Sequence, residues 1–88
     1  MSLAVIRSDV IAELRSTSPF PPATIEDRHD LRIDLGLTDD LKRSLAPPFQ
    51  RIARRFKNDA HISMDECGDL DDVKDAVVLV SSKAGVEA

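Results

Sequence analysis

The residues best able to do chemistry in this sequence are one cysteine, two histidines and several neighbouring carboxylates. Cys67 has no second cysteine with which to form a disulfide within the chain. His29 and His61 stand far apart in the sequence and do not give the spacing of a zinc site. The acids between positions 65 and 72 lack the glycine-centred order of a calcium loop. With no Ser/His/Asp arrangement and no glycine-rich phosphate loop, we do not expect an enzyme.

Cys67 would need a nearby base and an electropositive setting to act as a nucleophile. Its neighbours Asp65, Glu66 and Asp69 are acidic and should raise the pKa of the thiol instead. We interpret Cys67 as a small buried apolar residue.

The charges are unevenly distributed, although the formal net charge is only -4. Positions 42–57 contain cations and no acid, whereas positions 59–75 are strongly acidic. The cations are Lys42, Arg43, Arg51, Arg54, Arg55 and Lys57. They can form a solvated helix face, pair with the acidic segment 65–75 internally or across a dimer, or bind an acidic protein. Nucleic acid is a competing ligand, but the acidic chain, its few aromatic residues and the lack of a recognition-helix motif argue against it.

A hydroxyl and two carboxylates are adjacent at Thr38, Asp39 and Asp40, within residues 33–41, written IDLGLTDDL. Thr38 can cap a helical turn, because its oxygen can accept a backbone N–H. Asp39 and Asp40 would then lie in the first turn, against the positive end of the helix dipole. We expect this turn to be short and to end near Leu45.

The elements before this stretch are a helix and a long loop. Residues 3 to 15 predict an amphipathic helix, because apolar side chains recur there at steps of three and four. They are Leu3, Ile6, Val10 and Leu14. Three prolines between positions 19 and 22 must end helical geometry. In the loop 23–37, apolar residues are expected to hold the chain against the core. They are Ile25, Leu31, Ile33, Leu35 and Leu37.

A proline pair divides the next segment. Pro47 disfavours α geometry at Ala46, so a new helix is expected to start at Pro47 and Pro48. Residues 38–56 are therefore expected to form two helices and not one kinked helix. The second of them has an apolar face, formed by Phe49, Ile52, Ala53 and Phe56. Its opposite face carries three arginines, Arg51, Arg54 and Arg55.

The last third of the chain predicts two more helices. Ser63 and Glu66 have the spacing of a capping box, and Gly68 tolerates positive φ, so a single-turn helix is expected. Asp69 or Asp71 is expected to cap a closing helix, with Asp72 near its start. Its apolar stripe consists of Leu70, Val73, Val77 and Val80. The β-branched run 76–80 also suits a strand, but the spacing favours a helix.

The 88 residues predict one all-α domain, with residues 1–2 and 82–88 as flexible ends. No apolar run approaches the roughly 20 residues of a membrane span. The start of the chain does not resemble a signal peptide, so we expect a cytoplasmic protein with no membrane contact.

This order of elements resembles the acyl carrier protein family over nearly the whole chain. The resemblance is carried by Ile6, Val10 and Leu14 in the first helix, Leu31 and Asp34-Leu35-Gly36 in the loop, residues 52–56 in the central helix, and residues 62–77 in the last two helices. It implies a small four-helix bundle with a long loop after helix 1 and a one-turn third helix. It also implies a role in fatty acid or secondary metabolism.

Members of that family carry 4'-phosphopantetheine on the serine of an Asp-Ser-Leu motif at the start of the second helix, and this chain lacks the motif. Counting from Asp34-Leu35-Gly36 without a gap places Asp39 at the serine position, and a carboxylate cannot form the phosphodiester. Counting backward from Phe56 instead leaves Ser44 as a displaced serine, preceded by Arg43 in place of aspartate. We favour Ser44 as a helix-terminal or capping residue.

The sequence thus predicts an acyl-carrier-like domain that works through protein contacts and holds no cofactor. The family's second helix is usually acidic, whereas this one is basic, which implies a different and acidic partner. The predicted partner-binding residues are Arg43, Arg51, Arg54 and Arg55. Two alternatives stay open: a divergent carrier of acyl or peptidyl groups, modified with 4'-phosphopantetheine on Ser44, and a small helical protein that binds nucleic acid.

Overall fold

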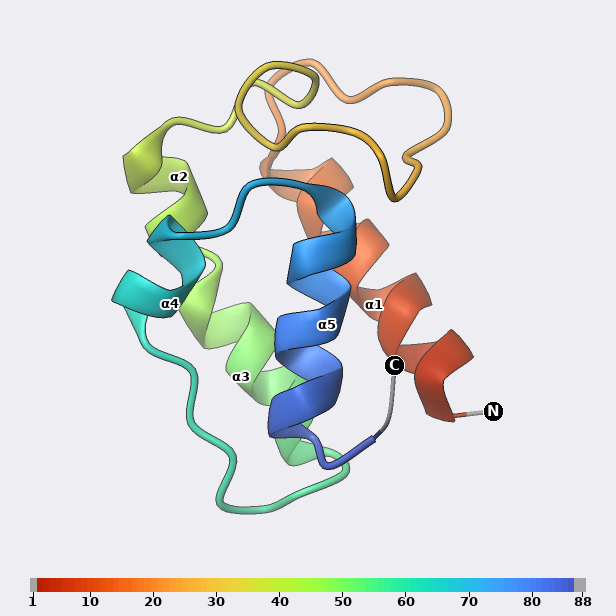
Figure 1. The fold of residues 1–88 in the computed structure, drawn as a ribbon, viewed down its shortest axis with the longest axis vertical. Coiled ribbons are helices and arrows are strands. Elements are labelled where there is room, and N and C mark those ends of the chain that lie inside the picture. Colours follow the sequence, from red (N-terminus) through yellow and green to blue (C-terminus); the bar gives the residue numbers. More distant parts are fainter. Residues whose placement is uncertain (1, 87–88) are drawn as a thin grey trace.

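The computed structural model describes residues 2–86, and the apolar stripes of the sequence there fold as helices joined by loops (Figure 1). The predicted all-α bundle, with its long first loop and its one-turn helix, is confirmed. The helices are α1 (Ser2–Thr17), α2 (Asp39–Arg43), α3 (Ala46–Arg54), α4 (Met64–Gly68) and α5 (Val73–Lys83). Within these residues no helix is long and apolar enough to cross a membrane.

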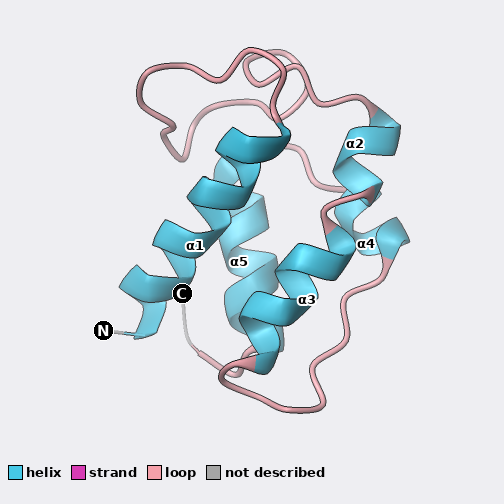
Figure 2. Cartoon of the chain, turned by 180° about the vertical axis from the view of Figure 1, so that it is seen from behind, coloured by secondary structure: helices cyan, strands magenta, loops and turns pink. Residues whose placement is uncertain are grey.

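The core lies between α1, α3 and α5, which contact one another pairwise (Figure 2). The predicted stripe of α1 is fully buried at Ile6, Val10 and Leu14, while Leu3 is partly buried at its start. Phe49 is the only aromatic side chain that is fully buried in the described part of the chain. The core is therefore filled almost entirely by aliphatic side chains, whose burial is the main favourable term in folding.

The long loop between α1 and α2 is fixed to the core by its apolar residues. Leu31, Leu35 and Leu37 are fully buried, and Ile25 is 6% exposed. Ile33 is 81% exposed, so its predicted place in the core is wrong. It lies in a tight turn that points it outward.

Backbone hydrogen bonds attach this loop to the start of α5. Leu31 N donates to the Asp71 carbonyl (2.9 Å), Val73 N to the His29 carbonyl (3.0 Å) and Lys74 N to the Asp27 carbonyl (3.1 Å). Because these bonds satisfy backbone groups on both segments, the loop is an integral layer of the fold.

Residues 39–54 form two helices, as predicted, with slightly different ends. α2 ends at Arg43, and α3 begins at Ala46, one residue before the proline pair. The predicted start at Pro47 is wrong by one residue. Both prolines still lie in the first turn of α3, where the N–H groups that they lack would have no acceptor within the helix. The first bond of this helix runs from Phe49 N to the Leu45 carbonyl (2.9 Å). 

The apolar face predicted for this helix is buried at Phe49, Ile52 and Ala53. Phe56 follows the end of α3 and is 37% exposed, so it does not belong to the core as predicted.

The capping box at α4 is present: Glu66 N donates to Ser63 Oγ (3.1 Å), and Ser63 N donates to Glu66 Oε1 (3.0 Å). Gly68 ends this helix without positive φ, contrary to the prediction. It instead provides space, because a Cβ there would lie 3.3 Å from Arg43 Cγ.

The closing helix α5 is capped by Asp72 and not by Asp69 or Asp71. Asp72 Oδ1 accepts from Asp75 N (2.8 Å), which satisfies one of the free donors of the first turn. α5 includes Ser82 and Lys83, and the buried Ala84 follows it, so the helix extends further than expected. Residues 1, 87 and 88, which belong to the predicted flexible ends, lie outside the described residues.

Replacing Gly36 with alanine tests how strictly the loop is fixed. Gly36 has φ +71°, and an added Cβ would lie 3.3 Å from Pro19 Cγ. Since left-handed geometry costs an alanine about 1–2 kcal/mol, Gly36→Ala should lower the free energy of unfolding by at least that amount in urea titrations. Gly85→Ala is the matched control, because Gly85 has φ +75° with nothing within 4 Å. An equal loss from both variants would contradict a packed contact at Gly36.

Candidate functional site

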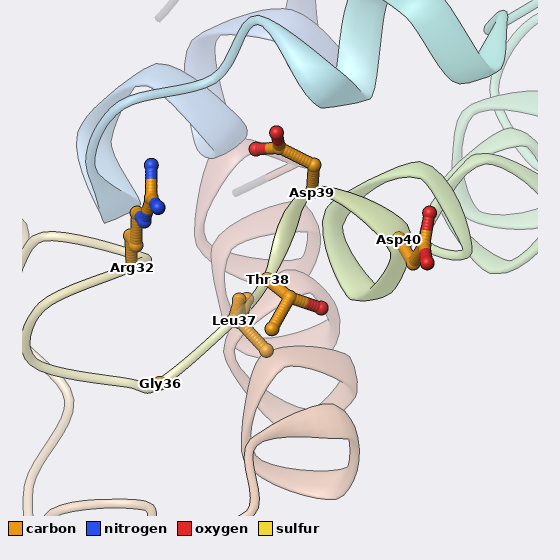
Figure 3. A pocket seen from close by; sticks show the side chains of 6 residues that line it. All are labelled: Arg32, Gly36, Leu37, Thr38, Asp39 and Asp40. Atoms are coloured by element: carbon orange, nitrogen blue, oxygen red, sulfur yellow. The ribbon is translucent and has the colours of Figure 1, made fainter.

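The start of α2 forms one wall of an open hollow of about 580 Å³ (Figure 3). Leu41 N donates to Thr38 Oγ1 (3.3 Å), so Thr38 caps α2 as predicted. The side chain of Asp39, the first residue of the helix, is 75% exposed. Figure 3 shows Arg32 on the opposite wall, which the loop provides. The position that the sequence aligned with the family's serine thus carries an exposed carboxylate at the helix start.

Lys42 belongs to this helix and is only 7% exposed. Its Nζ donates to the Leu70 carbonyl (3.0 Å) and lies 3.9 Å from Asp39 Oδ1. A buried ammonium group needs such partners, because its desolvation is costly. Asp39 therefore helps to compensate a buried charge, and Lys42, which the sequence placed among the basic group, is not part of the basic surface.

Ser44 is the C-terminal cap of α2, and its side chain is exposed. Its Oγ donates to the Leu41 carbonyl (2.6 Å). The hydroxyl therefore lies at the carbonyl end of α2, where the helix dipole is negative. Although α3 begins two residues later, Pro47 and Pro48 supply no N–H groups there.

The arginines predicted to bind a partner fall into two groups. Arg43 forms an ion pair with Asp65 (2.8 Å), which belongs to the acidic segment 65–75, and Arg55 pairs with Asp9 on α1 (2.5 Å). Arg54 Nε donates to the Ala60 carbonyl (2.8 Å), and Arg51 is exposed with no ion pair among the described residues. Internal pairing thus neutralises two of the four arginines. The exposed cations Arg51, Arg54 and Lys57 remain, and we name them the α3 cations.

A second hollow of about 270 Å³ runs between α1 and α3 beside the α3 cations. Its α3 wall carries Arg51 and Arg55, and its α1 wall carries Asp9 and Glu13. The two walls have opposite charge, so this hollow has no excess of either sign. An acidic partner would therefore be favoured only along the outer surface of α3.

Cys67 is fully buried, as the sequence predicts, and is not placed for chemistry. Burial, followed by the charge of Glu66, raises the pKa of its thiol from 9.0 to about 11. The hydrogen bond from Lys83 lowers the pKa of Glu66, with the bond from the Ser63 backbone as the next cause. Within residues 2–86 no three His, Cys, Asp or Glu side chains are grouped to hold a metal ion.

Comparison of the chain with protein-family models, with curated proteins and with solved structures gives no match. The function must be inferred from the geometry of the chain itself.

The thiol of Cys67 should react slowly while the protein is folded. Because its pKa is about 11 instead of 9.0, the thiolate population near pH 8 should fall about a hundredfold relative to the unfolded chain, and burial should slow the reaction further. Alkylation by iodoacetamide, followed by intact mass, should be rapid only in urea. The raised pKa also predicts stability that is complete below pH 9.0 and is lost as the pH rises towards about 11. Rapid alkylation of the folded chain at pH 8 would show that Cys67 is accessible.

Proposed function

We propose that this chain is an acyl-carrier-like domain that has lost its attachment site for 4'-phosphopantetheine and acts through protein contacts. The observation that carries this proposal is the exposed carboxylate of Asp39 at the start of α2, the position that the family resemblance assigns to a serine. The order of the helices, with a long first loop and a one-turn α4, agrees with the same resemblance.

The surroundings of Ser44 favour a structural role over modification. A phosphodiester is stabilised where several backbone N–H groups converge at the start of a helix. Ser44 instead lies among the last carbonyls of α2, and the proline pair removes N–H groups from the start of α3. The nearest amide of the linker, Leu45 N, already donates to the Lys42 carbonyl (3.1 Å). The residues present do not fit the prosthetic group at either Asp39 or Ser44.

The α3 cations are the surface that we assign to the partner. They are exposed and lie outside the two internal ion pairs of Arg43 and Arg55. Exposed cations speed encounter with an acidic protein and repel a basic one. The partner of this surface is therefore an acidic protein.

Incubation with a broad-specificity phosphopantetheinyl transferase and coenzyme A tests the loss of the attachment site. We expect no increase in intact mass, because neither Asp39 nor Ser44 provides a suitable hydroxyl at a helix start. A standard acyl carrier protein in the same reaction controls for enzyme activity. Addition of a single arm that disappears in Ser44→Ala would overturn the proposal and establish the divergent carrier.

Reversal of the α3 cations tests the partner surface. Affinity capture from an extract of the source cells at low salt should recover acidic proteins. Arg51→Glu combined with Arg54→Glu should lower the amount of these proteins that is recovered at least tenfold. Arg28→Glu is the control, because Arg28 is exposed in the loop, far along the chain from α3. Capture of nucleic acid, lost on nuclease treatment, would instead support the nucleic-acid alternative.

A further inference from the structure

Two large apolar side chains of the first loop remain almost completely in solvent. Phe20 and Ile33 are each 81% exposed, more than any other large hydrophobic residue among residues 2–86. The next most exposed is Met64, at 53%. Exposed apolar side chains mark an interaction site where they lie together in one patch.

Contacts within the loop fix the backbone next to both residues. Ser18 Oγ donates to the Leu35 carbonyl (2.5 Å), and Pro19 packs against Gly36, so the segment before Phe20 lies along the segment after Ile33. Prolines stand on both sides of Phe20. The two segments lie side by side, and Figure 1 shows the loop to which they both belong at one end of the molecule.

The turn that carries Ile33 is fixed by its own hydrogen bonds. Asp30 Oδ1 accepts from Arg32 N and from Ile33 N (2.8 Å each), and Gly36 N donates to the Arg32 carbonyl (3.1 Å). A surface that is ordered before binding loses little conformational entropy on association.

Both signs of charge line the hollow that begins beside Ile33. Arg32, which precedes Ile33, lines one wall of the hollow in Figure 3, and Asp39 and Asp40 line the other. Within the described residues Arg32 forms no ion pair, nor does Asp40. A partner of a single sign would leave one of these charges facing its like. A second copy, related to the first by a two-fold axis, would place Arg32 of each chain opposite the acids of the other chain.

We propose that the chain forms a two-fold symmetric dimer through a loop-end patch, made of Phe20, Arg32, Ile33, Asp39 and Asp40. The apolar side chains form the centre of the interface, and Arg32 of each copy pairs with Asp40 of the other. Asp40 is the better partner, because Asp39 lies 3.9 Å from Lys42 Nζ within its own chain. This proposal does not depend on the proposed function, since the α3 cations take no part.

Sedimentation velocity over a range of protein concentrations tests the dimer. The wild-type chain should shift from monomer to dimer as the concentration rises. Ile33→Asp should raise the dissociation constant at least tenfold, and so should Phe20→Ser. Met64→Ser is the matched control, because Met64 is an exposed apolar residue on α4, outside the patch, and it should leave the dissociation constant unchanged. A wild-type chain that stays monomeric throughout would overturn the proposal.

Charge exchange tests the symmetry of the interface. Arg32→Glu alone should raise the dissociation constant of the dimer at least tenfold, because acids would then face acids across the two-fold axis. Asp40→Arg alone should have the same effect, because cations would then face cations. An equimolar mixture of the two variants should dimerise, since every pair across the axis is again of opposite sign. Combining both substitutions in one chain should also restore the dimer. Failure of both the mixture and the double variant to dimerise would rule out this pairing.

Discussion

The absence of N–H groups at Pro47 and Pro48 is the constraint on which the central part of the fold depends. A helix that continued from α2 through these positions would lose two backbone hydrogen bonds and would meet the steric clash of each proline ring. The chain therefore ends one helix at Arg43 and starts another at Ala46. This break places the Ser44 hydroxyl beside the last carbonyls of α2, while the Thr38 cap places Asp39 at the start of the same helix.

A helix of five residues cannot be stable by itself, so tertiary contacts must hold α2. The Lys42 side chain extends from α2 to the Leu70 carbonyl, and the Arg43 side chain extends to Asp65 on α4. Gly68 allows the Arg43 side chain to pass close to the α4 backbone. Figure 1 shows α2 and α4 lying together at one side of the bundle. Two residues that the sequence marks as parts of a basic surface thus hold one short helix against another.

The features that the sequence predicted correctly are those that depend on local chemistry. The stripe of α1 requires only helical periodicity, and the capping box at Ser63 requires two residues three positions apart. The corrections arise where distant segments decide the outcome. Asp72 becomes the cap of α5, where the start of the helix is held to the loop through the bond from Val73 N to His29. Ile33 is the exception, because it lies in a local turn in which its N–H donates to the Asp30 carboxylate.

The candidate site was less predictable than the fold, because the function of a charge depends on what lies opposite to it. The arginines at positions 43 and 55 look alike in the sequence, yet each meets an aspartate from another part of the chain, 22 and 46 residues away respectively. No local pattern contains that information. Periodicity separated the arginines from the apolar face of α3, but it could not show which of them would remain available to a partner.

The two surfaces that we propose for binding lie at different places on the molecule. The loop occupies one end of the view in Figure 1, and the last turn of α3 points towards the opposite end. A dimer formed through the loop-end patch therefore leaves the α3 cations of both copies uncovered. Two such surfaces on one assembly raise the apparent affinity for an acidic partner that repeats its binding segment, because the second contact forms at a high effective concentration. Binding of the partner by a single copy would depend on a few surface charges that are screened by salt, and each of these contributes little to the binding free energy. Dimerisation would thus provide affinity that the exposed arginines and lysine of one chain are too few to supply.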